Sequence, residues 1–168
     1  MVSSVSLVLE ENAMPARLCS ALFLLLALLV LPPATAQAAD DGIVHAKSAY
    51  DMPETIDRLK KDIAAKGIVF FDEVDQSKLA ADAGIELAPS TLLIFGNPPL
   101  GTLFITADPD AGLDWPVRLL VYQDADGQVW VAYTDFAWIA KRHGITNRDK
   151  EFNMASEVIA SITSAVQK

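Results

Sequence analysis

An apolar run that ends in a proline-rich segment is the feature of this sequence that most constrains its fold. Thr91 to Phe95 is bounded by Pro89 and Gly96, and Asn97-Pro98-Pro99 follows at once. A short apolar run closed by Gly and Pro is typical of a strand at the centre of a sheet. A second rigid segment, Asp114-Trp115-Pro116, leads into another strand-like run. We therefore expect sharp turns at both segments, each beside a strand.

The rest of the chain alternates between the hydrophobic periodicity of strands and that of helices. Asp51 is suited to cap a helix, because Pro53 and Glu54 follow it in the first turn. The segment from Gly101 to Ala107 fits either a strand or a helix. The expected strands are residues 42–48, 68–74, 91–95, 117–123 and 128–134, and the expected helices are 52–66, 78–83, 135–143 and a last one that Asn147 could cap, with its apolar stripe formed by Phe152, Ala155, Ile159, Ile162 and Val166.

Two glycines are expected to be required by the backbone. Gly127 closes the turn Asp124-Ala125-Asp126-Gly127 between two strands, where a positive φ is common. Gly96 ends the central strand before the two prolines. Glycine has no Cβ, so it adopts positive φ without a steric clash. We expect positive φ at both positions.

The order of these elements, together with Phe95-Gly96-Asn97-Pro98, resembles the bacterial domain of unknown function 302 family over Asp41 to Ile145. The resemblance implies an α+β fold, in which an antiparallel sheet of about five strands is packed on one side by helices as a two-layer sandwich. It also implies the topology of the TATA-binding protein, which says nothing about function. No reaction is established for the family.

The first residues have the composition of a secretory signal. Leu18 to Leu31 is an apolar run that follows Arg17, and Ala36-Gln37-Ala38 after it is a typical cleavage site. As a helix the run rises roughly 21 Å, which is short of the roughly 30 Å hydrocarbon core. We expect residues 1–38 to be a signal peptide and residues 39–168 to be one domain. Translation could start at Met1 or Met14, and an uncleaved anchor is the alternative.

Charge and cysteine content exclude several classes of function. Cleavage removes one of 13 basic and two of 22 acidic side chains, so the expected mature chain has a formal charge of about −8. Such a domain is repelled by nucleic acid and by anionic lipid surfaces. Cys19 is the only cysteine, so the mature chain cannot carry out thiol chemistry or hold a Cys-based metal site. We expect a periplasmic or secreted protein without a nucleic-acid partner, a cofactor or a lasting membrane anchor.

The two histidines do not form a metal-binding pattern. His45 lies in the first expected strand, and His143 ends the helix of residues 135–143, where it could cap carbonyl groups. In the resembled family a histidine often follows the acidic residue after the second strand, and Gln76 stands there in this chain. Glutamine forms hydrogen bonds but does not titrate. This difference disfavours acid–base or metal chemistry.

The candidate binding residues cluster around the two rigid segments. Arg118 could bind a ligand carboxylate, or could pair with Asp114 or Asp135. Trp115 is suited either to core packing or to a pocket, because a large aromatic side chain gives contact area at low entropy cost. The expected ligand-binding or interface residues are Asn97, Thr102, Asp114, Trp115, Arg118 and His143.

These observations favour a non-catalytic role. We expect a domain that binds a small ligand or a periplasmic protein and that could form a homodimer. The alternative is a hydrolase-like or other enzyme that uses Asp114, Arg118 and His143 in a cleft. No catalytic nucleophile can be named from the residue spacing.

Export is directly testable. If residues 1–38 are a signal peptide, the protein recovered after secretion will begin within a few residues of Ala39 and will remain in solution. The intact mass of the exported protein measures this. Recovery of the full-length chain in the membrane fraction would contradict the prediction.

Overall fold

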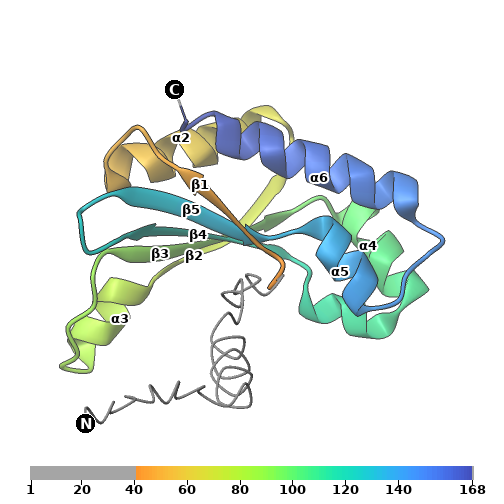
Figure 1. Ribbon diagram of the computed structural model, residues 1–168, viewed down its shortest axis with the longest axis horizontal. Coiled ribbons are helices and arrows are strands. Elements are labelled where there is room, and N and C mark those ends of the chain that lie inside the picture. The colour runs from red at the N-terminus through yellow and green to blue at the C-terminus, as the bar shows by residue number, and fades with distance from the viewer. Residues whose placement is uncertain (1–40, 168) are drawn as a thin grey trace, which may run out of the picture. The chain divides into compact units, whose positions relative to one another are not determined.

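Five antiparallel strands form one sheet in the order β1-β5-β4-β3-β2 (Figure 1). The computed structural model describes residues 41–167. The chain divides into two units, Met1–Ala39 and Asp40–Lys168, and the expected signal peptide lies outside the described residues. The strands are β1 (Ile43–Lys47), β2 (Val69–Asp75), β3 (Ser90–Gly96), β4 (Val117–Gln123) and β5 (Val129–Thr134).

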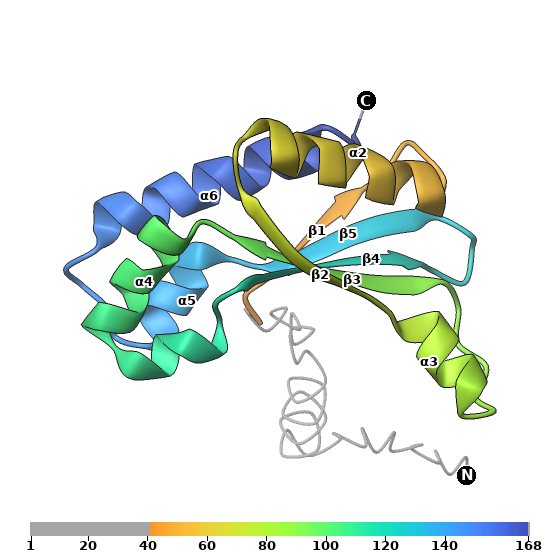
Figure 2. The ribbon, with the colours of Figure 1, turned by 180° about the vertical axis from the view of Figure 1, so that it is seen from behind.

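The long helices cover one face of this sheet, which confirms the expected two-layer α+β fold. α2 and α6 lie across the face, α4 and α5 lie at one end of the sheet, and α3 lies at the opposite end (Figures 1 and 2). The helices are α2 (Met52–Ala65), α3 (Gln76–Asp82), α4 (Pro98–Ala107), the 3-10 helix η1 (Pro109–Leu113), α5 (Phe136–Arg142) and α6 (Asp149–Ser164).

The core fills the space between the sheet and these helices. Leu59 and Ile63 of α2 and Leu93 of β3 are fully buried. The apolar stripe expected on the last helix is also buried, so the helical periodicity identified the covered face correctly. The largest fully buried side chains are Phe95, Leu59, Ile63, Leu93, Leu119, Ile162, Val121, Val131, Val166 and Thr55.

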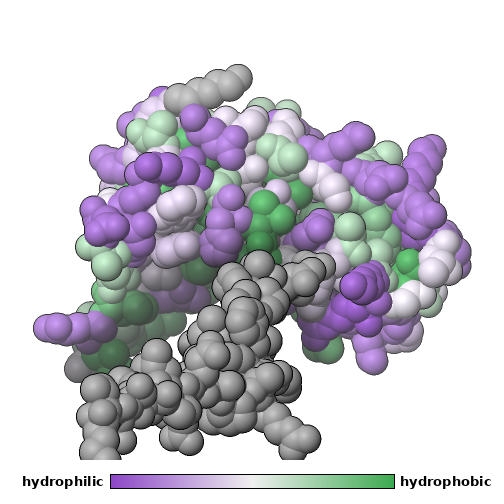
Figure 3. Space-filling model, viewed as in Figure 1, coloured by the Kyte–Doolittle hydropathy of each residue, from purple (hydrophilic) through white to green (hydrophobic). Residues whose placement is uncertain are grey.

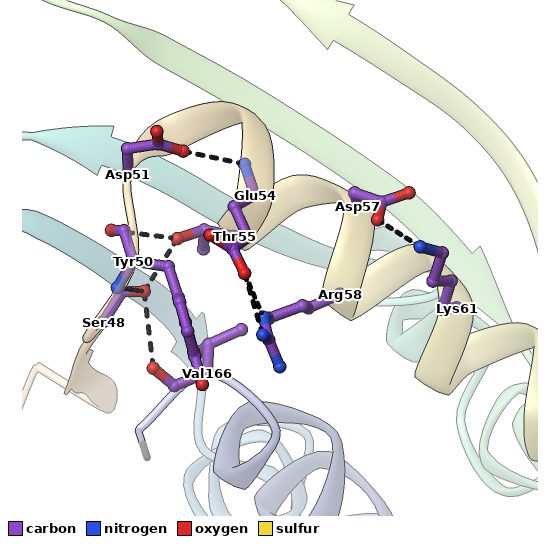
Figure 4. Close-up of polar contacts among 9 residues, drawn as sticks. All are labelled: Ser48, Tyr50, Asp51, Glu54, Thr55, Asp57, Arg58, Lys61 and Val166. Carbon is purple, nitrogen blue, oxygen red and sulfur yellow. Dashed lines mark hydrogen bonds and ion pairs between the residues drawn. The ribbon is translucent and has the colours of Figure 1, made fainter.

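A polar network joins the end of β1, the start of α2 and the end of α6 (Figure 4). The buried hydroxyls of Ser48 and Thr55 form a hydrogen bond of 2.7 Å, and the Ser48 hydroxyl also donates to the Val166 carbonyl at 3.4 Å. The Thr55 Oγ1 lies 3.3 Å from the Tyr50 carbonyl oxygen, and because each hydroxyl has one proton, two of these three contacts are donated at a time. Buried polar groups are costly without partners, and these contacts provide partners for both hydroxyls where the three elements meet.

Two expectations about helix boundaries were wrong. The segment after β3 was expected to be a sharp turn, but it is the start of a helix. The Asn97 Oδ1 accepts the Leu100 N–H at 3.2 Å, and the prolines occupy the first turn of α4. Proline is tolerated there because the missing N–H has no intrahelical partner. Asn147 was expected to cap the last helix. Arg148 is instead the residue before the first turn of α6, and no side chain caps this helix.

The hairpin between β4 and β5 has the predicted turn. Gly127 has φ +80°, as expected, whereas Gly96 does not have a positive φ. The Asp124 Oδ1 accepts the N–H groups of Asp126 and Gln128 at 3.0 and 2.9 Å. The Trp130 indole N–H donates to the other Asp124 oxygen at 2.7 Å, and this bond lowers the pKa of the Asp124 carboxyl.

β2 and α3 form the most exposed end of the described domain. The register between β2 and β3 shifts between Phe70 and Asp72, which marks a bulge in this edge strand. Apolar side chains gather around α3 in Figure 3, where Leu79, Ile85 and Leu87 are exposed. No helix in residues 41–167 is long and apolar enough to cross a membrane.

The backbone requirement at Gly127 can be measured. Gly127→Ala places a Cβ on a residue with positive φ, and we expect it to lower the free energy of unfolding by roughly 1 kcal/mol or more. Urea denaturation measures the change. The control is Gly112→Ala, because Gly112 lacks a positive φ and its nearest neighbour would lie at an ordinary 3.9 Å. Equal stability of both variants would refute the prediction.

Candidate functional site

The segment that links η1 to β4 contains a buried carboxylate. Asp114 has a side chain that is only 4% exposed. Its Oδ2 lies 2.7 Å from the His143 Nε2, and the Arg142 Nη1 donates to both carboxylate oxygens at 3.2 Å. The Arg118 Nη2 lies 3.5 Å from the Asp114 Oδ1 and donates to the Leu113 carbonyl at 2.8 Å. The carboxylate is therefore surrounded by cationic and hydrogen-bonding groups.

Local sequence signals bring His143 and Arg142 to this position. α5 begins after Asp135, whose Oδ1 accepts the Ala137 N–H at 3.1 Å. The helix ends after Arg142, and Gly144 with φ +61° turns the chain away. His143 follows directly, at the end of this helix. Its side chain was expected to cap carbonyl groups of the helix, but it contacts the Asp114 carboxylate.

These contacts hold together segments that are distant in the sequence. A buried carboxylate is strongly disfavoured unless it is paired, and Asp114 is paired with three side chains, those of Arg118, Arg142 and His143. The His143 side chain is 6% exposed, whereas those of Arg118 and Arg142 are 52% and 44% exposed. A water-sized cavity of about 10 Å³ beside Asp114 is also lined by Arg118 and Thr134. Solvent therefore reaches the guanidinium groups far more readily than it reaches the Asp114–His143 pair.

Trp115 directs its side chain toward α4. A Cβ added at Gly101 would overlap the Trp115 indole, and one added at Gly96 would lie 3.0 Å from its Nε1. The indole also packs edge-on against Phe71, with ring centroids 6.0 Å apart. A side chain at Gly96 would thus crowd Trp115, and this close approach, rather than the expected positive φ, is what favours glycine at the end of β3.

An apolar cavity of about 40 Å³ lies beside Trp115, between the sheet and helices α4 and α6. Ile68, Asn97, Leu100 and Val158 line this cavity and also line a surface groove of about 420 Å³. The groove adds the polar side chains of Lys66, Glu157 and Ser161 together with Met154. The remaining residues of the cavity lining are Phe95, Gly96, Gly101, Phe104, Trp115, Val117, Phe136, Ala155, Ile159 and Ile162.

The six candidate residues fall into two groups and one outlier. Asp114, Arg118 and His143 come together, and the expected pairing of Arg118 with Asp114 is present. Asn97 and Trp115 line the apolar cavity. Thr102 belongs to neither group, because its hydroxyl donates to the Pro98 carbonyl at 2.8 Å on the exposed side of α4.

Arg142 is the residue that sequence reasoning missed. It stands next to His143 in Lys141-Arg142-His143, so a basic cluster at the end of a helix was the available signal. Its guanidinium lies against the Trp138 ring, 5.5 Å from the centroid. Gln76, which stands where the resembled family often has a histidine, accepts a hydrogen bond from the Ser90 hydroxyl at 2.7 Å.

Among residues 41–167, no group of three or more His, Cys, Asp or Glu side chains is arranged to hold a metal ion. The Asp114–His143 pair has two arginines as its other neighbours, and positive charges disfavour a cation at this position. The chemistry available here is binding of an anion or of an apolar group.

Comparison with known families and structures places the fold. The family described as "Domain of unknown function DUF302" matches residues 44–168. A crystal structure of an uncharacterized conserved DUF302 protein from Bacillus stearothermophilus is similar, with a TM-score of 0.69 and 16% sequence identity. The similarity covers 75% of this chain and 98% of that one. At this identity the likeness concerns the fold alone.

The chain is also similar to part of two longer curated proteins. "Fluoride-specific ion channel FluC 1" from Brucella suis biovar 1 (strain 1330) is 38% identical over 113 residues, which are 67% of this chain and 44% of that protein. "Fluoride-specific ion channel FluC 2" from Brucella melitensis biotype 1 (strain ATCC 23456) is also 38% identical over 113 residues, or 42% of its length. The chain thus spans less than half the length of these relatives.

The packing of Trp115 can be tested at Gly101. Gly101→Ala forces the indole to move, and we expect a loss of roughly 1–3 kcal/mol in unfolding free energy with a change in tryptophan fluorescence. Alanine favours helices more than glycine does, so a loss cannot come from helix propensity. Thr102→Ala, at the exposed neighbouring position, is the control. Unchanged stability and fluorescence in Gly101→Ala would contradict this packing.

Proposed function

Because this chain belongs to the DUF302 family, whose description names no activity, we propose its function from the site: it is a non-catalytic domain that binds a small amphipathic molecule. The apolar end of the ligand enters the cavity beside Trp115, and its polar end lies in the groove outside. The observation that carries the proposal is that the cavity and the groove are adjacent, because they share four lining residues: Ile68, Asn97, Leu100 and Val158.

The size of the cavity limits the apolar end of the ligand. A water molecule takes up about 30 Å³ in the liquid, and an apolar cavity of about 150 Å³ holds benzene. The cavity of about 40 Å³ therefore suits a methyl- or ethyl-sized end of a chain. Its lining is almost entirely apolar, so such a group enters it more favourably than water does.

The groove offers groups that could bind the polar end. Asn97 is exposed and presents an amide, and Glu157 and Ser161 on α6 are exposed as well. Lys66 pairs with Asp62 at 2.6 Å, so its charge is already partly compensated. A neutral head group with hydrogen-bonding capacity, such as a hydroxyl or an amide, fits this mixture best.

An enzyme that uses Asp114, Arg118 and His143 is the second candidate. The contact of 2.7 Å between Asp114 and His143 favours it, because a carboxylate can orient a histidine for proton transfer. Both side chains are almost completely buried, however, and a general base must reach the proton that it removes. The geometry thus supports a binding role more strongly than catalysis.

We propose that the domain acts after export, in the periplasm or outside the cell, with residues 1–38 removed. The fluoride-channel relatives match it over less than half of their length, so we infer that a related domain accompanies a channel in those proteins. A binding domain can serve either as a separate protein or as part of a longer chain. Formation of a homodimer stays a prediction, which native mass spectrometry would test.

Occupation of the cavity can be tested with 1-butanol as the probe. We expect titration to shift the NMR signals of the Ala155 and Ile159 methyl groups and to change the fluorescence of Trp115. Ala155→Val adds two methyl groups inside the cavity and is expected to weaken binding about tenfold or more, since the space is already small.

Ala160→Val on the same helix is the matched control, because Ala160 is exposed and does not line the cavity. It should bind the probe as the original protein does. If Ala155→Val binds butanol unchanged, or if the methyl signals do not move in the original protein, the cavity is only a packing defect and the proposal is wrong.

A further inference from the structure

We propose that Arg118 and Arg142 together form a second binding site, which takes the carboxylate group of a small organic acid with an apolar body. This site is separate from the cavity beside Trp115. It lies where the end of η1, the start of β4 and the end of α5 meet around Asp114.

The shared carboxylate brings the two guanidinium groups together. The Arg118 Nη2 lies 3.5 Å and the Arg142 Nη1 lies 3.2 Å from the same Asp114 oxygen. Arg118 is also fixed by the Leu113 carbonyl at 2.8 Å, and Arg142 by the face of Trp138. Both groups are thus positioned before a ligand arrives, which lowers the entropy cost of binding.

Each guanidinium keeps unused donors. Within residues 41–167, Nε and Nη1 of Arg118 and Nε and Nη2 of Arg142 form no hydrogen bond. The two side chains are about half exposed, so these N–H groups can reach a ligand. The free Nε and Nη2 of Arg142 lie on one edge of its guanidinium and can bind a carboxylate through two parallel N–H···O bonds, and Arg118 can add a single bond.

The local charge favours an anion although the protein is acidic. Two arginines and one aspartate leave a formal charge of +1 with His143 neutral, in a chain whose total is −9. The Asp114 carboxylate is 4% exposed and has partners on both oxygens, so it lies behind the guanidinium groups.

Neutralising Asp114 does not account for both arginines. Arg142 already contacts both carboxylate oxygens, and His143 contacts one of them at 2.7 Å. Arg118 adds only a contact of 3.5 Å and stays 52% exposed. The Arg118 guanidinium, which the Leu113 carbonyl holds in place, therefore adds little to the compensation of Asp114 and is available to a group outside the protein.

Apolar surface lies next to both arginines. Leu113, which holds Arg118 through its carbonyl, is 67% exposed, and the half-buried Trp138 packs against Arg142. Exposed apolar groups beside a cationic pair favour a ligand that carries its carboxylate on a hydrocarbon or aromatic body. An inorganic anion would gain nothing from these contacts.

The test is a titration of the full mature protein with sodium benzoate, followed through the NMR signals of the arginine Nε–H groups. We expect the Arg118 and Arg142 signals to shift with a dissociation constant on the order of 1 mM. Arg118→Gln and Arg142→Gln should each weaken binding about tenfold. Inorganic phosphate and acetate, measured in the same way, should bind more weakly than benzoate.

Arg58→Gln is the matched control, because it removes the same charge from an arginine paired with Glu54 on α2. Thermal unfolding shows whether each variant is folded, and the wild-type shifts test the site even if a variant is not. Arginine signals that do not move, or equal binding by all three variants, would overturn the proposal. Phosphate that binds as tightly as benzoate would overturn the assignment to an organic carboxylate. The Ala155→Val variant should bind benzoate normally, so failure of this site and failure of the cavity are distinguishable.

Discussion

The rest of this end of the domain depends on the buried carboxylate of Asp114. It cannot remain charged inside the protein without partners, so the end of α5 must lie against the start of β4. The next residue, Trp115, directs its indole toward Gly96 and Gly101, where the lack of side chains leaves room. One electrostatic requirement thus positions both the arginine pair and the wall of the apolar cavity.

The two candidate sites have opposite chemistry and lie on a short piece of chain. Val117 and Phe136 line both the apolar cavity and the small space beside Asp114, so the two sites share a wall of packed side chains. Energetic coupling between two sites requires an element with two arrangements that both ligands bias. The shared wall therefore makes independent occupation of the sites the simpler expectation. Membership in the family accounts for the fold but leaves the ligands to be decided by these side chains.

Sequence patterns predicted what depends on neighbours along the chain. The capping of α2 by Asp51, the positive φ of Gly127 and the apolar stripe of α6 follow from local chemistry, and the structure has all three. Asn97 and Gly96 were misread, because a strand that passes directly into a proline-rich helix resembles a turn. Arg142 was missed although it stands beside His143, because the basic cluster at this helix end does not show which of its side chains contact Asp114.

The bulge in β2 has a consequence for how this protein behaves when it is concentrated. β2 is an edge strand, and an edge with unpaired N–H and C=O groups can recruit the strand of another molecule. The shift between Phe70 and Asp72 interrupts the regular spacing of those groups, and Asp72, Glu73 and Asp75 place negative charge along the strand. A second β2 that approached it would meet both mismatched geometry and repulsion. The bulge and the acidic side chains of this edge strand therefore disfavour pairing with a second molecule.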